Sequence, residues 1–327
     1  MKVAILGTGN ISKEFMNASG IAEVEVSAVY HREIAKAAAF AENYGIPAYF
    51  DDYDEMLKED FFDTVYTGLP NSLHYPYAKK ALCAGKNVLI EKPFCSNLAE
   101  FDELVNLSHE NNVYLIEMDR VTSLPNFAIV RDRLGELGPI RAVTIDYAQY
   151  SRKYDDYLNG KISNVFTTEF SGGVLSDLLV YCVNYTVALF GKPSSLIYVV
   201  DKLATGVDIS GALIMKYPGF IATLTGSKNS IGDKRSTIQG EWGTFMAETV
   251  PSVLKDIDKV TRDGSVERIS VHQDYDGTTY TLCEMKRIID NNDRAAGDIR
   301  LAQSRKVMEV LQSARKSAGI VFEADNK

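Results

Sequence analysis

The feature that most constrains the fold is a glycine-rich turn at the amino end of the chain. The sequence KVAILGTGNIS places Gly7-x-Gly9-x-x-Ser12 directly after the apolar run Val3–Leu6 and at the start of a helical segment. Glycines there permit a tight turn and a close approach of backbone to a pyrophosphate, while the helix N-terminus supplies amide donors and partial positive charge. Ser12 stands where the pattern usually has Gly or Ala, and it is still small. The turn predicts dinucleotide binding, with a purely structural turn as the alternative.

Strand-like and helix-like segments alternate from residue 2 to residue 118. Two of the helical segments end on glycines suited to C-terminal caps, Gly45 and Gly85, and a third begins at Asn97 with Glu100 in a capping-box-like arrangement. Strands that alternate with helices predict βαβ units and a parallel sheet. The apolar runs expected to be strands are Val3–Leu6, Val24–Tyr30, Thr64–Thr67, Val88–Ile90 and Val113–Ile116.

After about residue 120 this rhythm changes. A long strand is expected at 140–150 and an apolar helix at 173–190, with a polar, aromatic stretch of no clear period between them. Several strand-like runs then follow with few helices, which is typical of a mixed or antiparallel sheet of the α+β kind. Since 327 residues exceed one ordinary core, we predict an N-terminal, doubly wound, dinucleotide-binding Rossmann domain at 1–120 and a C-terminal α+β domain at 121–327 for substrate binding and oligomerisation.

Composition narrows the class of partner. A net charge of -9 argues against binding nucleic acid or anionic membrane through bulk electrostatics. The four cysteines form no CxxC pair and the four histidines no HExxH-like spacing, so neither a disulfide framework nor a metal site is expected. MKVAILGTGN is expected to be a first strand rather than a signal peptide, and no run of about 18 apolar residues predicts a membrane span. We therefore expect a cytoplasmic protein with a small-molecule partner.

The end of the second predicted strand bears on the choice of cofactor. NAD sites usually place Asp or Glu about 20 residues after the glycine turn, to bind the ribose 2′-hydroxyl. This chain has Tyr30, His31 and Arg32 instead, and a guanidinium can bind a 2′-phosphate bidentately. The sequence thus favours NADP(H) over NAD(H). The alternative is that Arg32 is a solvated residue beside Glu33.

The stretch NVLIEKPF raises the question of a functional lysine. Lys92 follows the apolar run 88–90, at the edge where ligands bind in a doubly wound sheet, and Pro93 disfavours a helical backbone before it. The surrounding residues, Glu91 and Pro93, would fix its direction. A solvated surface turn remains the other interpretation. The loop GLPNSLH after the fourth predicted strand lies at the same edge and carries Pro70, Asn71 and His74.

The second half of the chain contains one charge within an apolar helical segment, SGGVLSDLLVYCVNY. Asp177 is that charge, and Tyr181 lies four residues on, at helical spacing for the same face. An unpaired buried carboxylate is costly, so Asp177 must be hydrogen-bonded, paired or exposed to a cavity. A structural Asp177 with Tyr181 in the core is the alternative to a catalytic pair.

Together the Gly7-x-Gly9 turn, PNSLH, AGKNVLIEKP and GGVLSDLLVY resemble the Gfo/Idh/MocA family of NAD(P)-dependent oxidoreductases, from residue 1 through the final helix. The resemblance implies an N-terminal Rossmann domain and a C-terminal domain with a large open, mostly antiparallel sheet, often used for oligomer contacts. A homodimer or homotetramer through that sheet is therefore expected. One departure from the family pattern is Ser12 in the turn. The other is Leu178-Leu179 after Asp177, where many members have a glycine, and it bears on the shape of the substrate pocket.

The resemblance also implies residue roles. Lys92 matches the family's catalytic lysine, Asp177 its aspartate and Tyr181 its acid/base position, which is His or Tyr in the family. A tyrosine there resembles the dihydrodiol and NADP-dependent aldose dehydrogenases more than the inositol dehydrogenases, which carry histidine. Free tyrosine has a pKa of about 10, so a cation such as Lys92 would be needed for Tyr181 to carry the proton. The reverse assignment makes Lys92 the proton carrier. Expected cofactor contacts are Gly7, Gly9, Asn10, Ile11, His31, Arg32, Pro70, Asn71, His74, Glu91 and Lys92.

The expected substrate is a small sugar, polyol or diol, with hydride transfer between nicotinamide C4 and a carbinol or carbonyl carbon. Two other classes stay open: a catalytically inactive, NADP-sensing regulator, and a reductase of an unsaturated apolar substrate like the biliverdin reductases. The presence of both Lys92 and Tyr181 favours an enzyme. Four further residues are candidates for the substrate pocket or for ordinary packing: Arg120, Arg152, Tyr154 and Tyr157.

Overall fold

The structure is a computed structural model that describes residues 1–326, and the chain divides into two compact units. The first unit contains 1–118 and 278–305, and the second contains 119–277 and 306–326. The segment 278–305 thus joins the first unit, whereas the expected boundary at residue 120 put it in the second domain. No helix among residues 1–326 is long and apolar enough to cross a membrane.

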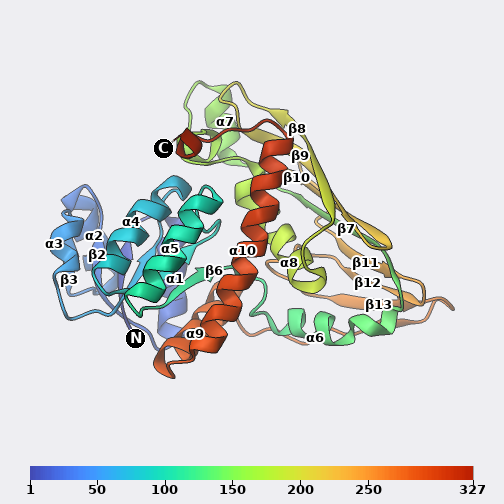
Figure 1. Cartoon of the computed structure of the whole chain (residues 1–327), viewed down its shortest axis with the longest axis horizontal. Coiled ribbons are helices and arrows are strands. Elements are labelled where there is room, and N and C mark those ends of the chain that lie inside the picture. Colours follow the sequence, from blue (N-terminus) through green and yellow to red (C-terminus); the bar gives the residue numbers. More distant parts are fainter. Residues whose placement is uncertain (327) are drawn as a thin grey trace. The chain divides into compact units, whose positions relative to one another are not determined.

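The first unit is built on a parallel sheet in the strand order β3-β2-β1-β4-β5-β6. This order confirms the predicted doubly wound Rossmann fold, with a topological switch point between β1 and β4. Figure 1 shows strands and helices alternating through this part of the chain. The strands are β1 Lys2–Leu6, β2 Glu25–Tyr30, β3 Ala48–Phe50, β4 Thr64–Thr67, β5 Asn87–Glu91 and β6 Leu115–Met118.

The predicted helix ends of this unit are confirmed. Gly45 caps α2 in the left-handed conformation at φ 68°, and Gly85 adopts φ 72° just after α4. The Asn97 side chain accepts a 3.0 Å hydrogen bond from the backbone N–H of Glu100 at the start of α5. The helices are α1 Asn10–Ile21, α2 Ile34–Tyr44, α3 Tyr53–Leu57, α4 Asn71–Cys83, α5 Leu98–Glu110 and α9 Gly277–Asp290. Helix α10, Arg294–Ser317, begins in this unit and continues into the second from Lys306.

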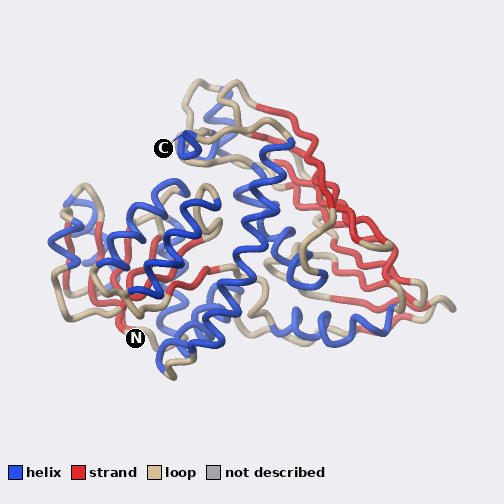
Figure 2. The backbone as a smooth tube through the Cα atoms, in the orientation of Figure 1, coloured by secondary structure: helices blue, strands red, loops and turns tan. Residues whose placement is uncertain are grey.

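The second unit contains a sheet in the order β14-β13-β12-β11-β7-β10-β9-β8, drawn in red in Figure 2. β7 and β10 are parallel and their other neighbours antiparallel, which confirms the predicted mixed, mostly antiparallel sheet. The strands are β7 Ile140–Ala148, β8 Ser195–Lys202, β9 Asp208–Tyr217, β10 Phe220–Ser227, β11 Ser236–Gly240, β12 Gly243–Ala247, β13 Ile257–Thr261 and β14 Val266–Arg268.

Helices of this unit are α6 Pro125–Arg133, α7 Arg152–Leu158 and α8 Val180–Phe190, the last preceded by a π-helical turn, η3 Leu175–Leu179. Gly226 of β10 lets η3 approach the sheet, because a Cβ there would lie 2.8 Å from side-chain atoms of Leu179 and Val174. In β8, β9 and β10, every second side chain lies on the opposite face of the sheet from η3. Among them, four large apolar side chains are exposed: Ile197, Val199, Ile214 and Ile221.

Candidate functional site

The glycine turn after β1 is required by the fold at its first position. Gly7 has φ 92°, and its N–H donates a 2.9 Å hydrogen bond to the carbonyl of Tyr30. A Cβ on Gly7 would lie 2.6 Å from the carbonyl oxygen of Gly68, the residue that follows β4. The loops after β1 and β4 therefore touch through backbone, and any larger residue at position 7 forces them apart.

The second glycine is not required by the fold. Gly9 has an ordinary φ of -77° as the N-cap of α1, and a Cβ added to it would meet no atom within 4 Å. Within the described chain, the first turn of α1 carries no acidic residue and Gly9 contributes no side-chain cap. The open space thus faces uncapped helix amides, which fits the pyrophosphate of a dinucleotide.

The packing around the third position of the turn explains why a serine is tolerated there. Ser12 is fully buried, and its Oγ lies 2.7 Å from where a Cβ of Gly68 would be. A small residue is needed there because helix α1 packs directly on the switch point of the sheet. Ser12 meets that need as glycine or alanine would.

The two glycines make a matched pair of tests. Gly9→Ala is expected to change the free energy of unfolding by less than about 1 kcal/mol, because it meets no atom, yet to weaken NADP(H) binding by about tenfold or more through the methyl group in the phosphate space. Gly7→Ala is expected to cost more than about 2 kcal/mol of stability through its clash and positive φ. Chemical denaturation and NADPH titration measure both. Unchanged cofactor affinity in folded Gly9→Ala protein would contradict the assignment of this space.

At the end of β2, Arg32 is available to a ligand. Its side chain is 84% exposed, and its Nε lies 4.0 Å from Glu33. Glu33 is held more closely by Lys36, at 2.7 Å, and this hydrogen bond lowers the pKa of the Glu33 carboxyl. His31 accepts a 3.0 Å hydrogen bond from the Glu33 N–H through Nδ1, so its ring is fixed at the start of α2.

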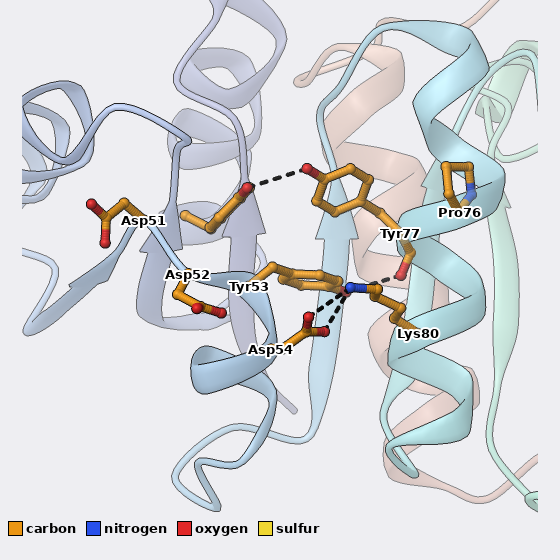
Figure 3. Close-up of a pocket in the computed structure, with 8 residues that line it drawn as sticks. Asp51, Asp52, Tyr53, Asp54, Pro76, Tyr77 and Lys80 are labelled. Atoms are coloured by element: carbon orange, nitrogen blue, oxygen red, sulfur yellow. Dashed lines mark hydrogen bonds and ion pairs between the residues drawn. The ribbon is translucent and has the colours of Figure 1, made fainter.

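A polar hollow of about 290 Å³ lies beside the end of β2 (Figure 3). The hydroxyls of Tyr30 and Tyr77 are 3.2 Å apart, and the Tyr53 hydroxyl donates a 3.0 Å hydrogen bond to the Tyr77 carbonyl. Burial raises the pKa of Tyr53 well above its usual value. The rim carries three carboxylates, of which Asp54 pairs with Lys80 at 2.7 Å. This acidic lining disfavours a phosphate group, which leaves Arg32 as the better phosphate contact. The lining residues are Tyr30, Asp51, Asp52, Tyr53, Asp54, Pro76, Tyr77 and Lys80.

At the end of β5, the buried Glu91 side chain holds the backbone of Lys92 by a hydrogen bond. Glu91 is 3% exposed; its Oε1 accepts a 2.8 Å hydrogen bond from the Tyr66 hydroxyl, and its Oε2 accepts one of 3.2 Å from the Lys92 N–H. Lys92 is partly exposed, and its peptide bond to Pro93 is cis. The buried carboxylate therefore fixes the backbone from which the lysine side chain leaves the sheet edge.

His74 joins the loops that follow β4 and β5. It is 1% exposed, and its two ring nitrogens lie 2.9 Å from the carbonyl oxygens of Leu69 and Pro93. Burial lowers the pKa of His74, and a neutral imidazole has one N–H, so it donates to one of these carbonyls at a time. His74, which was expected to contact the cofactor, is therefore buried and links the backbone of the loop after β4 to that of the loop after β5.

In the second unit, the double glycine before η3 is required by close packing. A Cβ on Gly172 would collide with the carbonyl of Val165, and one on Gly173, at φ 108°, with the Asp208 carboxylate. Asp208 is 1% exposed and accepts hydrogen bonds of 2.6 Å from the Leu175 N–H and the Tyr198 hydroxyl. The start of the π-helical turn is thus tied to β8 and β9.

Asp177 and Tyr181 lie on this same continuous element, in η3 and α8. The Asp177 carboxylate forms an ion pair with Lys228, a residue that the sequence analysis did not single out. Lys228 directly follows strand β10, as Lys92 follows β5. A lysine at the end of a predicted strand is the sequence feature that could have identified Lys228 as a candidate. Tyr181 is 7% exposed, with its ring centroid 6.1 Å from that of Tyr147 on β7. A π-helical turn is a frequent feature of functional sites.

The four residues suggested for the substrate pocket lie in different parts of the second unit. Tyr154 and Tyr157 stack on each other at 6.2 Å between ring centroids, and both pack edge-on against buried Phe166. These tyrosines are therefore packing residues of α7. Arg152 begins α7, and Arg120 follows β6 with φ 58°. Among residues 1–326, His, Cys, Asp and Glu side chains form no group that could hold a metal ion.

Comparison with known proteins gives two family models that match the chain. The model of the oxidoreductase family with an NAD-binding Rossmann fold, GFO_IDH_MocA, matches residues 1–118, and the GFO/IDH/MocA C-terminal domain matches residues 132–246. The scyllo-inositol 2-dehydrogenase (NADP(+)) of Bacillus subtilis strain 168 is 35% identical over 99% of both chains. The trans-1,2-dihydrobenzene-1,2-diol dehydrogenase of Xenopus tropicalis is 24% identical over 98% of this chain and 99% of its own.

Solved structures share the whole fold. A 3-ketoreductase from Actinomadura kijaniata, in complex with NADP and TDP-benzene, superposes with a TM-score of 0.84 at 21% identity, covering 97% of each chain. A levoglucosan dehydrogenase in complex with NADH and levoglucosan superposes with a TM-score of 0.83 at 16% identity, covering 98% of this chain and 97% of its own. These likenesses establish the fold of both units.

Proposed function

The chain belongs to the GFO/IDH/MocA family of NAD(P)-binding oxidoreductases, and we propose that it transfers a hydride between NADP(H) and a carbinol or carbonyl carbon of a sugar, polyol or diol. The observation that carries the proposal is Lys92, braced by buried Glu91 at the carboxyl edge of a dinucleotide-binding sheet. The relative that uses NADP⁺ with scyllo-inositol, 35% identical over the whole chain, supports a cyclic polyol as the first substrate to examine.

Three side chains receive roles in this proposal. When bound, the nicotinamide ring accepts or supplies the hydride, and the protein must orient the substrate and move one proton at its oxygen. Lys92 polarises that oxygen with its positive charge, Tyr181 takes or returns the hydroxyl proton, and Asp177 orients the reacting groups. The reverse assignment, with Lys92 as proton carrier and Tyr181 as a hydrogen-bond donor, uses the same three residues.

Arg32 supports NADP(H) over NAD(H). Its exposed guanidinium lies at the end of β2, where NAD-binding chains usually carry a carboxylate. We expect Arg32→Ala to raise the Kd for NADPH by about 10- to 100-fold, the usual value of a charge-assisted phosphate contact, and to leave the Kd for NADH within about twofold. Arg131→Ala removes the same charge from an exposed arginine of α6 and should change neither value. Equal losses for both cofactors in Arg32→Ala would contradict the NADP assignment.

A turnover screen tests the proposed reaction. NADP⁺ and NAD⁺ are each combined with scyllo-inositol, other polyols, aldoses and diols, and formation of reduced cofactor is followed by absorbance. We expect turnover with NADP⁺ and at least one cyclic polyol or sugar. Tight NADPH binding without turnover on any of them would favour a regulator, and reduction of an unsaturated apolar compound instead would favour a biliverdin reductase-like activity.

We also propose a homodimer or homotetramer formed through the sheet of the second unit. The alternate side chains that face away from η3 include exposed Ile197, Val199, Ile214 and Ile221, an apolar surface that a second copy would cover. Light scattering of the purified protein tests this, and a monomer at micromolar concentration would contradict it.

A further inference from the structure

Lys228 is a covered lysine whose ammonium group meets the Asp177 carboxylate. Its side chain is 8% exposed, whereas that of Asp177 is 33% exposed. The lysine is therefore the more deeply covered partner of this ion pair. A buried ammonium ion without an ionic partner is strongly unfavourable. Removing the Asp177 carboxylate would therefore leave the Lys228 charge uncompensated.

The backbone around Lys228 is fixed on two sides. Its N–H donates a 2.9 Å hydrogen bond to the carbonyl of Ile209 on β9, and its carbonyl accepts one of 2.9 Å from Ser151, directly before α7. Two residues earlier, Gly226 allows η3 to contact β10 closely. The lysine therefore joins β9, the start of α7 and the π-helical turn, and main-chain contacts fix the backbone position from which its side chain starts.

A second carboxylate increases the need for this positive charge. Asp208, on β9, accepts hydrogen bonds from Leu175 of η3 and from Tyr198. Burial raises the pKa of Asp208, while those hydrogen bonds and the charge of Lys228 act in the opposite direction. Two carboxylates near one short turn repel each other, and a nearby cation offsets this repulsion. Lys228 supplies that cation.

We propose that Lys228 is a positioning residue for the reaction, which holds the Asp177 carboxylate ionised and in one orientation. This inference rests on the proposed function. An ionised carboxylate in contact with an ammonium ion is a poor proton acceptor and a good hydrogen-bond acceptor. Asp177 thereby orients the reacting groups instead of removing the substrate proton, and proton transfer is left to Tyr181 or Lys92.

Steady-state kinetics of three variants test the proposal. Lys228→Met is expected to lower kcat by about 10- to 100-fold, with less than about threefold change in the Kd for NADPH, because a charge-assisted contact of the reacting assembly is lost. Lys228→Arg restores the charge and should lose less than about tenfold. The matched control is Lys259→Met, which removes a lysine of β13 that is 17% exposed and paired with Glu136 at 2.6 Å. Its kcat should stay within about twofold.

The Asp177→Asn background separates positioning from general stability. If Lys228 acts through Asp177, adding Lys228→Met to Asp177→Asn should lower kcat by less than about threefold more. The double variant removes both charges of the Asp177–Lys228 ion pair and leaves neither of them unpaired, so it should fold even if Lys228→Met does not. Wild-type kcat in Lys228→Met, or an equal loss in both backgrounds, would overturn this inference alone. A wild-type protein without turnover would overturn the proposed function as well, so the two failures are distinguishable.

Discussion

Replacing Lys92 with methionine is expected to lower kcat by about 10³-fold, within the range of 10² to 10⁴ that removal of an electrostatic or acid–base group produces. Methionine keeps much of the length and apolar stem of the side chain and removes its charge and its protons. The loss is expected in both proposed assignments, because Lys92 either carries the proton or supplies the cation that Tyr181 needs. The Kd for NADPH should change by less than about tenfold, since Lys92 is only partly exposed and its proposed role is at the substrate oxygen.

The control for this variant is Lys79→Met on α4. Lys79 belongs to the same unit, is 42% exposed and pairs with Glu103 at 2.5 Å, so Lys79→Met removes a lysine charge away from the sheet edge. Single-turnover measurements at saturating NADP⁺ compare the two variants. Turnover of Lys92→Met within tenfold of the wild type would rule out a central role for this lysine.

Removing only the phenolic hydroxyl of Tyr181, as Tyr181→Phe, is expected to lower kcat by about 10²–10⁴-fold if Tyr181 is the acid/base. The ring remains, so its packing at 6.1 Å from Tyr147 is retained. The reason for the loss is chemical: phenylalanine can neither accept nor return a proton at the substrate oxygen. The rate of hydride transfer is measured with and without the hydroxyl at matched substrate saturation.

Tyr185→Phe is the matched control, because Tyr185 lies one helical turn further along α8 and is 3% exposed. It loses the same hydroxyl from the same helix, and its kcat should stay within about twofold. A loss below tenfold in Tyr181→Phe would assign the proton to Lys92 instead. A large loss in both tyrosine variants would point to a damaged helix.

The sheet and its glycine turn were predictable from sequence because their signals are local. The apolar runs, the caps at Gly45 and Asn97, and the Gly7 turn each depend on residues within a few positions. Strand β3 is only three residues long, and α7 buries none of its residues. Neither segment therefore shows the periodic apolar pattern from which a strand or helix is predicted. Short elements of this kind are fixed by their neighbours in the fold.

The braces around the candidate site could not be predicted, because each joins residues far apart in the chain. Glu91 is held by Tyr66, His74 lies between the carbonyls of Leu69 and Pro93, and Asp177 pairs with Lys228. The sequence shows that a carboxylate in an apolar helix needs a partner, and that partner is selected by the packing of β10 on η3. The contrast between Gly7 and Gly9 likewise needs the surrounding atoms.

Transfer of a labelled hydride tests the central claim most directly. Scyllo-inositol deuterated at its ring carbons is incubated with the protein and NADP⁺, and the reduced cofactor is analysed by mass spectrometry and NMR; the turnover screen supplies an alternative deuterated polyol or sugar if it identifies a better substrate. The proposed function predicts one deuterium at nicotinamide C4, on a single face of the ring, and loss of this transfer in Lys92→Met. Tight binding of NADP(H) with no label transferred from any polyol, sugar or diol would contradict it.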